Sequence, residues 1–258
     1  MNSGTIDSLA AKRPETATKC STGNAALNYF LAGGYEAGVV TTIYGPSGSG
    51  KTNLALLAAV RVAETGKKVL IIDTEGGIAV ERISQMLENK LMKNEVLSRI
   101  LFFQPLNFKD QEIVFERFKD IDWKEIGMLL VDSISMLYRL ELGKAEAIFE
   151  TNSSLGRQIA AAVELARRRK IPVLMTNQVY SDFDKKDTVK MVGGDLLKYG
   201  SKCLIELKKG EGVRALMLRK HRSLQRENEF LFRIVENGIE EVQTNFGDVQ
   251  KYDEYQSS

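Results

Sequence analysis

The sequence is poor in the residues that build disulfide frameworks and metal clusters. It has two cysteines, Cys20 and Cys203, which lie far apart in no metal-ligand spacing, and one histidine, His221, with no such spacing around it. No apolar run approaches the roughly 18 residues that are needed to span a bilayer. The N-terminus also lacks the basic-then-apolar layout of a secretory signal. We therefore expect a cytoplasmic protein with reduced thiols, no membrane partner and no His/Cys metal site.

The net charge of the chain is also close to zero. The 36 Lys and Arg residues against 34 Asp and Glu residues give a formal charge of +2, so a nucleic acid would have to be held by local basic patches. The 43% hydrophobic content is ordinary for a globular protein, and 258 residues can fold as one α/β domain. There is no internal repeat and no low-complexity segment.

From Val39 onward, short apolar β-rich runs alternate with longer helical stretches, which is typical of βαβ units. The predicted strands of this part are residues 39–44, 69–73, 100–104, 128–132 and 171–176. The predicted helices are residues 51–65, 79–92, 109–119 and 144–170. Later runs predict antiparallel strands at residues 203–207, 213–218 and 230–234. The fold class predicted is α/β, with a mostly parallel central sheet flanked by helices and an antiparallel C-terminal edge.

The last of the predicted helices ends in a basic run, Arg167 to Lys170. Cations are favourable at a helix C-terminus, where they meet the negative end of the helix dipole. A solvated helix end is therefore favoured over a nucleic-acid contact for this run.

One segment matches the phosphate-loop pattern G-x-x-x-x-G-K-[ST]. Its residues are Gly45, Pro46, Ser47, Gly48, Ser49, Gly50, Lys51 and Thr52. It follows a predicted strand and opens a predicted helix, which is the context that the motif requires. The glycines let backbone N–H groups turn inward around phosphates, and the new helix adds its positive end. Lys51 would supply charge to the phosphates, and the Thr52 hydroxyl would be a ligand of Mg²⁺.

Polar residues at three strand ends are candidates to complete this site. Asp132 closes an apolar strand and is expected to hold Mg²⁺ through its water shell; the alternative is a cap of the following turn. Glu75 follows the strand at 69–73 and would orient or deprotonate a water, although capping of the next helix fits its spacing equally well. Asn177-Gln178, at the end of the strand at 171–176, offers an amide that could contact the γ-phosphate and change position when it leaves, or an ordinary turn residue.

A wider set of segments occurs in a characteristic order. These segments are Ser21-Thr22-Gly23, Gly33-Gly34, the phosphate loop, Asp73-Thr74-Glu75-Gly76-Gly77, Glu81-Arg82, Val131-Asp132-Ser133, Thr176-Asn177-Gln178-Val179 and Lys220-His221-Arg222. In this order the chain resembles the core of the RecA/RadA recombinase superfamily, and most closely its RadB family of archaeal paralogues, from residue 21 to about 242.

The resemblance implies a RecA-like P-loop NTPase core that binds ATP and Mg²⁺. It implies that Glu75 is the water-activating carboxylate, that Gln178 is the γ-phosphate sensor, and that Arg82 stacks on adenine. An exposed helix arginine is the alternative for Arg82. The domain division expected is a flexible lead-in at 1–20, a RecA-like ATPase domain at 21–245 and a polar tail at 246–258.

The basic cluster Lys220-His221-Arg222 matches the place where related recombinases project cations toward a neighbouring subunit's ATP. Two cations beside a histidine could stabilise charge on a phosphoryl group. A DNA-backbone contact and a solvated strand end fit equally well, because charge alone does not separate the three.

Two departures from the recombinase pattern bear on function. The first 20 residues leave no room for a helix-hairpin-helix domain, and no Phe-x-x-Ala element precedes the core, so we do not expect long filaments. The expected DNA loops, residues 139–156 and 179–192, are electrically balanced, so their binding to phosphates should be modest and salt-sensitive. Tyr180 and Phe183 could stack on bases or anchor the second loop.

These observations together predict an ATP-binding accessory protein of homologous recombination and DNA repair. It would bind single-stranded or branched DNA, hydrolyse ATP weakly and exchange no strands alone. The resemblance implies a RadA-type recombinase and a Holliday-junction resolvase as partners, and self-association. The alternatives are a full strand-exchange recombinase and a circadian-clock-like signalling ATPase that does not act on DNA.

Overall fold

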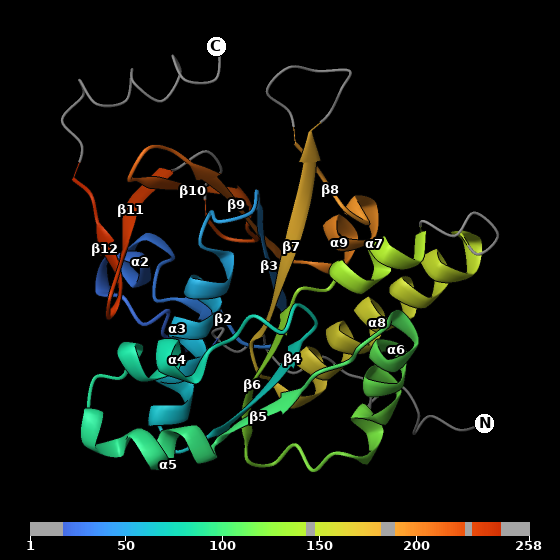
Figure 1. The fold of residues 1–258 in the computed structure, drawn as a ribbon, viewed down its shortest axis with the longest axis horizontal. Helices are drawn as coiled ribbons and strands as arrows, with labels where there is room; N and C mark the ends of the chain where they lie inside the picture. Colours follow the sequence, from blue (N-terminus) through green and yellow to red (C-terminus); the bar gives the residue numbers. More distant parts are fainter. Residues whose placement is uncertain (1–17, 143–147, 182–188, 225–228, 244–258) are drawn as a thin grey trace, which may run out of the picture.

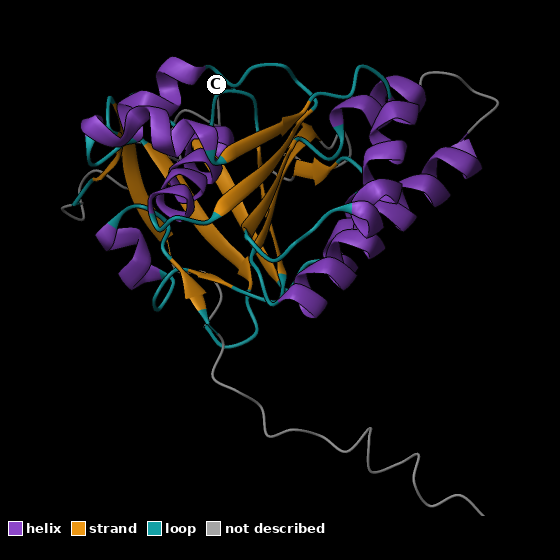
Figure 2. Cartoon of the chain, turned by 90° about the horizontal axis from the view of Figure 1, so that it is seen from below, coloured by secondary structure: helices purple, strands orange, loops and turns teal. Residues whose placement is uncertain are grey.

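A computed structural model describes residues 18–142, 148–181, 189–224 and 229–243. These residues form one central sheet with helices packed on both faces (Figures 1 and 2). No helix among them is long and apolar enough to cross a membrane.

The central sheet is parallel in its middle and antiparallel at one side. In spatial order its strands are β12 (Gly238–Glu241), β11 (Glu229–Val235), β10 (Arg214–Lys220), β9 (Cys203–Lys209), β3 (Val40–Gly45), β7 (Val173–Ser181), β6 (Ile126–Asp132), β4 (Lys68–Asp73) and β5 (Ile100–Phe103). The strands from β9 to β5 run parallel, and β10, β11 and β12 pair antiparallel. A short strand β8 (Val189–Met191) pairs with β7. The predicted fold class is confirmed.

The helices divide into two groups, each covering one face of the sheet. One face carries α2 (Ala25–Phe30), α3 (Lys51–Glu64), α4 (Val80–Met86) and α5 (Lys93–Ser98), with a short 3₁₀ turn at Lys90–Met92. The other face carries α6 (Phe108–Glu116), α7 (Met136–Leu142), α8 (Ile148–Arg169) and α9 (Gly194–Gly200), with a 3₁₀ turn at Arg117–Asp120. Each group buries a separate apolar cluster against the sheet. Nearly every residue of α3 from Leu54 to Ala63 is buried, which fits its place beneath the middle strands.

Two of the predicted elements need correction. The helix predicted at 79–92 ends at Met86, because Leu87 turns to an extended conformation and the Asn89 side chain caps the following 3₁₀ turn. The strand at 203–207 was predicted to be antiparallel, but β9 is parallel to β3 and antiparallel only to β10. It therefore extends the parallel part of the sheet by one strand.

The described parts of the two expected DNA loops are largely helix and strand. Within 139–156, α7 continues to Leu142 and α8 begins at Ile148, since Leu137, Tyr138 and Leu155 are buried in the second cluster. Within 179–192, β7 extends to Ser181 and pairs with β8, while Phe183 lies outside the described residues.

The structure describes only part of the expected N-terminal lead-in and none of the expected C-terminal tail. Lys19–Cys20, assigned above to the lead-in, form a strand β1 that pairs with β2 (Tyr35–Glu36). Residues 1–17 and 244–258 lie outside the described residues.

Candidate nucleotide site

The phosphate loop leaves the carboxyl end of β3 and leads directly into α3. Gly48 and Gly50 have positive φ angles of 73° and 101°, a conformation that glycine adopts without steric cost. At Gly45 a side chain is excluded for another reason, because a Cβ atom would lie 2.4 Å from the Leu207 carbonyl oxygen. The loop therefore curls tightly over β9 and presents the N-terminus of α3 to any bound anion.

Lys51 lies folded back into this loop. Its Nζ donates to the carbonyl oxygens of Gly45, at 2.9 Å, and Pro46, at 2.8 Å, and the residue is only 8% exposed. Burial lowers the pKa of Lys51, while the nearby carboxylates of Glu75 and Asp132 act in the opposite direction. The ammonium thus sits where phosphate oxygens could replace weaker carbonyl partners.

The donor set of the loop fits a phosphate. The Ser49 hydroxyl is buried and has no hydrogen-bond partner among the described residues. A buried polar atom without a partner is costly, so it indicates a group that the site is built to receive. Together with Lys51 and the loop N–H groups, this hydroxyl suits an anionic ligand.

Thr52 and Asp132 form the hydroxyl and carboxylate pair expected of a magnesium site. The Thr52 hydroxyl donates to both Asp132 carboxylate oxygens, at 2.9 and 3.1 Å, and the Thr176 hydroxyl also donates to this carboxylate. Among the described residues no group of three or more Asp, Glu, His or Cys residues is placed to hold a metal. Mg²⁺ binds through one or two carboxylates together with phosphate oxygens and water, which fits this sparse set.

Burial raises the pKa of Asp132 to about 6, against the opposing effect of its hydrogen bonds from Thr176 and Thr52. Without a divalent cation, the folded protein thus holds this proton more tightly than the unfolded chain does. The free energy of unfolding should therefore fall as the pH rises from about 4 to about 6, and stay low above it.

Asp132→Asn should abolish this pH-dependent decrease in the free energy of unfolding. We expect the variant to be more stable than the parent above pH 6 in EDTA, by on the order of 2–3 kcal/mol, because the buried charge is gone. Urea denaturation between pH 5 and 8 measures this, with the exposed Asp120→Asn as a control. Equal stability of the Asp132 variant and the parent at pH 7.5 would contradict the raised pKa.

Glu75 and Gln178 meet beside the loop. The Gln178 Nε2 donates to the Glu75 Oε1 at 2.8 Å, although the two residues are 103 positions apart. The strand register explains the meeting, since Gln178 pairs with Gly45 and Asp73 pairs with Asp132 at the same edge of the sheet. Glu75 does not cap the next helix, because α4 has Ala79 at its N-cap position and no side-chain cap. That alternative is wrong.

Arg82 is half-buried rather than exposed. Its guanidinium donates to the Asn53 side chain at 2.7 Å and to the carbonyl oxygens of Val235 and Glu236, at 3.0 and 2.6 Å, in the turn between β11 and β12. The exposed-arginine alternative is therefore wrong, while the stacking of Arg82 on adenine stays a prediction.

The structure does not bring Lys220, His221 and Arg222 to the phosphate loop. Lys220 donates to the carbonyl oxygens of Lys198 and Ser201, at 2.5 and 2.7 Å. Arg222 lies 2.5 Å from the buried carboxylate of Glu36, and His221, whose side chain is 3% exposed, lies 3.8 Å from it. A solvated strand end is thus wrong for His221, and a contact of the cluster with a neighbour's ATP or with DNA stays a prediction.

Two cations that the sequence did not indicate lie against the loop. The Arg214 Nε donates to the Gly48 carbonyl oxygen at 3.4 Å, and the Lys209 Nζ would lie 3.5 Å from a Cβ atom on Gly48. Lys209 ends β9, which pairs with β3, and Arg214 begins β10, which pairs with β9. No local sequence motif indicates that these strands lie beside the loop.

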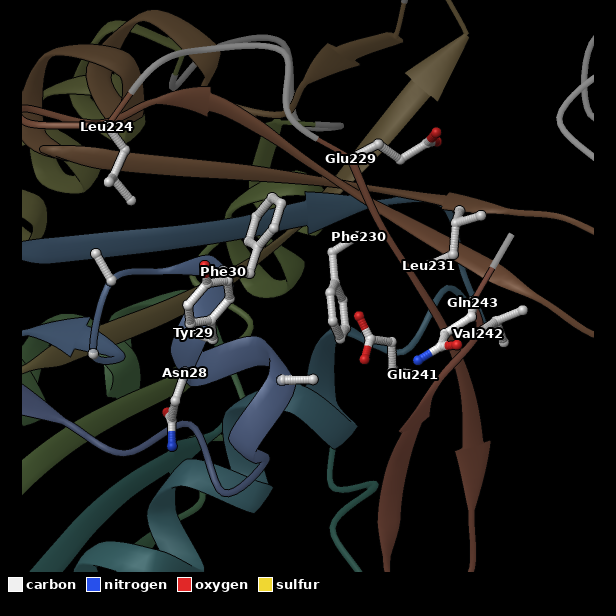
Figure 3. Close-up of a pocket in the computed structure, with 13 residues that line it drawn as sticks. Asn28, Tyr29, Phe30, Leu224, Glu229, Phe230, Leu231, Glu241, Val242 and Gln243 are labelled. Carbon is white, nitrogen blue, oxygen red and sulfur yellow. The ribbon is translucent and has the colours of Figure 1, made fainter. Parts of the chain in front are cut away.

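A separate hollow of about 980 Å³ lies between α2 and the β11–β12 hairpin (Figure 3). Phe30 and Phe230 are in contact at its wall, with ring centroids 5.6 Å apart and planes tilted by 50°, and Glu229 and Glu241 also line it. It shares no residue with the phosphate loop, and its two carboxylates make it unsuited to a polyphosphate.

Comparison with known proteins identifies the family. The family model described as Rad51 matches residues 12–242. The chain belongs to the Rad51 family. It therefore contains a Rad51-family NTPase domain, and the recombinase resemblance read from the sequence is confirmed.

Similar proteins place this Rad51-family chain near one archaeal group. It is 39% identical to DNA repair and recombination protein RadB of Methanobrevibacter smithii, with 84% of this chain and 93% of that protein covered. It is 38% identical to the protein of the same name from Methanococcus maripaludis strain C5, with 85% and 99% covered. A solved structure described as a crystal structure of the RadB recombinase superposes with a TM-score of 0.72 at 38% identity, and covers 87% of this chain and all of that one. The predicted likeness to the RadB family and the RecA-like fold are both confirmed.

Proposed function

We propose that this Rad51-family chain is an ATP-binding accessory protein of homologous recombination and DNA repair. The observation that supports this most is the meeting of the phosphate loop, the Thr52–Asp132 pair and the Glu75–Gln178 hydrogen bond at one edge of the sheet. The names of its relatives support a role in DNA repair and recombination.

Each residue of the site has its own proposed role in ATP binding or hydrolysis. The loop N–H groups and Lys51 would bind the phosphates. Thr52 and, through the metal's water shell, Asp132 would hold Mg²⁺, which would supply charge neutralisation at the phosphate oxygens. Glu75 orients a water molecule, and Gln178 responds to the presence of the γ-phosphate. Hydrolysis is weak, and ATP acts mainly as a conformational ligand.

Gln178 connects this site to the residues that are expected to touch DNA. It lies on β7, which continues only to Ser181 before the described residues are interrupted within the expected second loop. A displacement of the Gln178 amide on loss of the γ-phosphate would therefore act on that loop directly. The loop carries Lys185, Lys186 and Lys190 against Asp182, Asp184 and Asp187, so its hold on DNA is modest. The partners proposed are single-stranded or branched DNA, a RadA-type recombinase, a Holliday-junction resolvase and a second copy of the chain.

Turnover and strand exchange test this proposal together. We expect slow ATP hydrolysis that single-stranded DNA changes less than about threefold, and no strand exchange by the protein alone. Addition of the protein to a RadA-type recombinase should change the yield of that recombinase's exchange. Vigorous exchange without the recombinase would indicate a full recombinase, and an absence of DNA binding even at low salt would indicate a signalling ATPase.

A further inference from the structure

A second anion-binding candidate lies at the amino-terminal edge of the central sheet. It is a hollow of about 420 Å³ whose wall includes the residues just before or at the start of four parallel strands, among them Ala37, Lys67, Ile126 and Pro172. The nucleotide site lies at the carboxyl ends of the same strands, which the arrowheads mark in Figure 1. Because these strands are about six residues long, the two edges are about 20 Å apart.

The charges that line this hollow are all of one sign. Its described lining contains no Asp or Glu and six cationic residues: Lys19, Arg61, Lys67, Lys124, Arg169 and Lys170. The hollow between α2 and the β11–β12 hairpin, by contrast, is lined by two carboxylates and no cation.

Three of the six cations have no ion-pair partner within the described part of the chain. Lys19 pairs with Glu36, and Arg61 pairs with Glu64 and Glu88. Lys170 also has an interaction partner. The other three, Lys67, Lys124 and Arg169, are exposed and form no ion pair with a described residue.

Two carboxylates, those of Asp122 and Glu125, are close in sequence to the hollow but are not part of its lining. The Glu125 carboxylate lies 2.6 Å from the Lys68 Nζ, and the Asp122 side chain accepts a hydrogen bond from the Lys124 backbone N–H. Asp122 keeps its negative charge and Glu125 also interacts with Lys67, but the lining itself carries cations and no carboxylate.

Stabilisation by helix dipoles explains the position of only some of these cations. The C-termini of α3 and α8 reach this edge, and Arg61 and Arg169 lie in their last turns, where cations are stabilised. Lys67 lies three residues beyond the end of α3, and Lys124 belongs to neither helix. These two lysines bring charge to the hollow from loops between the elements.

We propose that this hollow binds the phosphate backbone of duplex DNA, at a face separate from the expected DNA loops. Cations that are exposed and without ion pairs displace the counterions of a duplex, and such contacts need no base sequence. The only aromatic residue of the described lining, Trp123, is 3% exposed and donates to the Phe118 carbonyl oxygen, so the wall offers no ring for unpaired bases to stack on. The inference rests on the proposed function only in taking DNA as the partner.

The test is a charge-neutralised triple variant, Lys67→Gln, Lys124→Gln and Arg169→Gln. A matched control, Lys93→Gln, Lys109→Gln and Arg233→Gln, makes the same charge change on α5, α6 and β11. The affinity for a fluorescein-labelled 40-base-pair duplex is measured by anisotropy from 50 to 200 mM NaCl. We expect the slope of log affinity against log salt to become shallower by about 2 to 3 for the test variant, with affinity at 100 mM lower by on the order of 10- to 100-fold. The control variant and the affinity of both variants for Mg·ATP should match the parent.

Three results would overturn the inference. The first is an unchanged salt slope in the test variant, which would leave the proposed recombination function standing. The second is an equal loss of affinity for a 40-nucleotide single strand, which would exclude a duplex surface. The third is no duplex binding by the parent at 50 mM salt. Strand exchange by the protein alone would overturn the proposed function and leave this surface unaffected.

Discussion

Lys51→Ala is expected to abolish measurable binding of Mg·ATP. The substitution removes the one loop side chain that carries positive charge to the phosphates, and hydrogen bonds to charged groups contribute about 1.5–3 kcal/mol each. The loss in affinity should therefore reach at least about 100-fold. Titration calorimetry of the parent and the variant with ATP and Mg²⁺ measures it.

The control for this prediction is Lys93→Ala, an exposed lysine on α5. Because Lys51 also bonds the Gly45 and Pro46 carbonyl oxygens, circular dichroism must first show that the variant folds. A folded Lys51 variant that binds ATP as the parent does would contradict the assignment of the loop.

Glu75→Gln is expected to lower ATP turnover by about 10²–10⁴-fold and to leave Mg·ATP binding within about threefold of the parent. The range is the contribution usual for a positioned general base, which an amide does not replace. The amide oxygen of the new side chain can still accept the hydrogen bond from the Gln178 Nε2, so the geometry of the site is preserved. Single-turnover hydrolysis separates the chemical step from binding.

Glu81→Gln, an exposed change in the first turn of α4, is the matched control for that experiment. Should the Glu75 variant hydrolyse ATP at the rate of the parent, the water would have to be oriented by another residue, and the role that the resemblance implies for Glu75 would be wrong.

The geometry of the candidate nucleotide site was predictable because its signals are local and its strands are parallel. Glycine spacing marks the loop, and each carboxylate or amide follows an apolar run. Parallel strands place their carboxyl ends at one edge, so the meeting of Glu75 with Gln178 follows from topology although 103 residues separate them.

What the sequence did not predict depends on distant contacts. The helix α2 and the strands β1 and β12 are two to six residues long, too short to be stable or recognisable without the core they pack against. The residues of β9 do not determine whether it runs parallel to β3. The path of the chain between the two strands determines that direction. The partners of Arg82 in the β11–β12 turn lie about 153 residues away, so no spacing rule could link them.

The bonds of Arg82 also have a consequence for the choice of base. The donors of a guanidinium lie in one plane, so its contacts with Asn53 and the β11–β12 turn use its edge and leave its flat faces out of these bonds. If a purine rests on one of those faces, the β11–β12 hairpin sets the tilt of the base. The phosphate loop, at the other end of the chain, sets the position of the triphosphate. The preference for adenine over guanine would then depend on the length of the β11–β12 turn, while the binding of the phosphates would not.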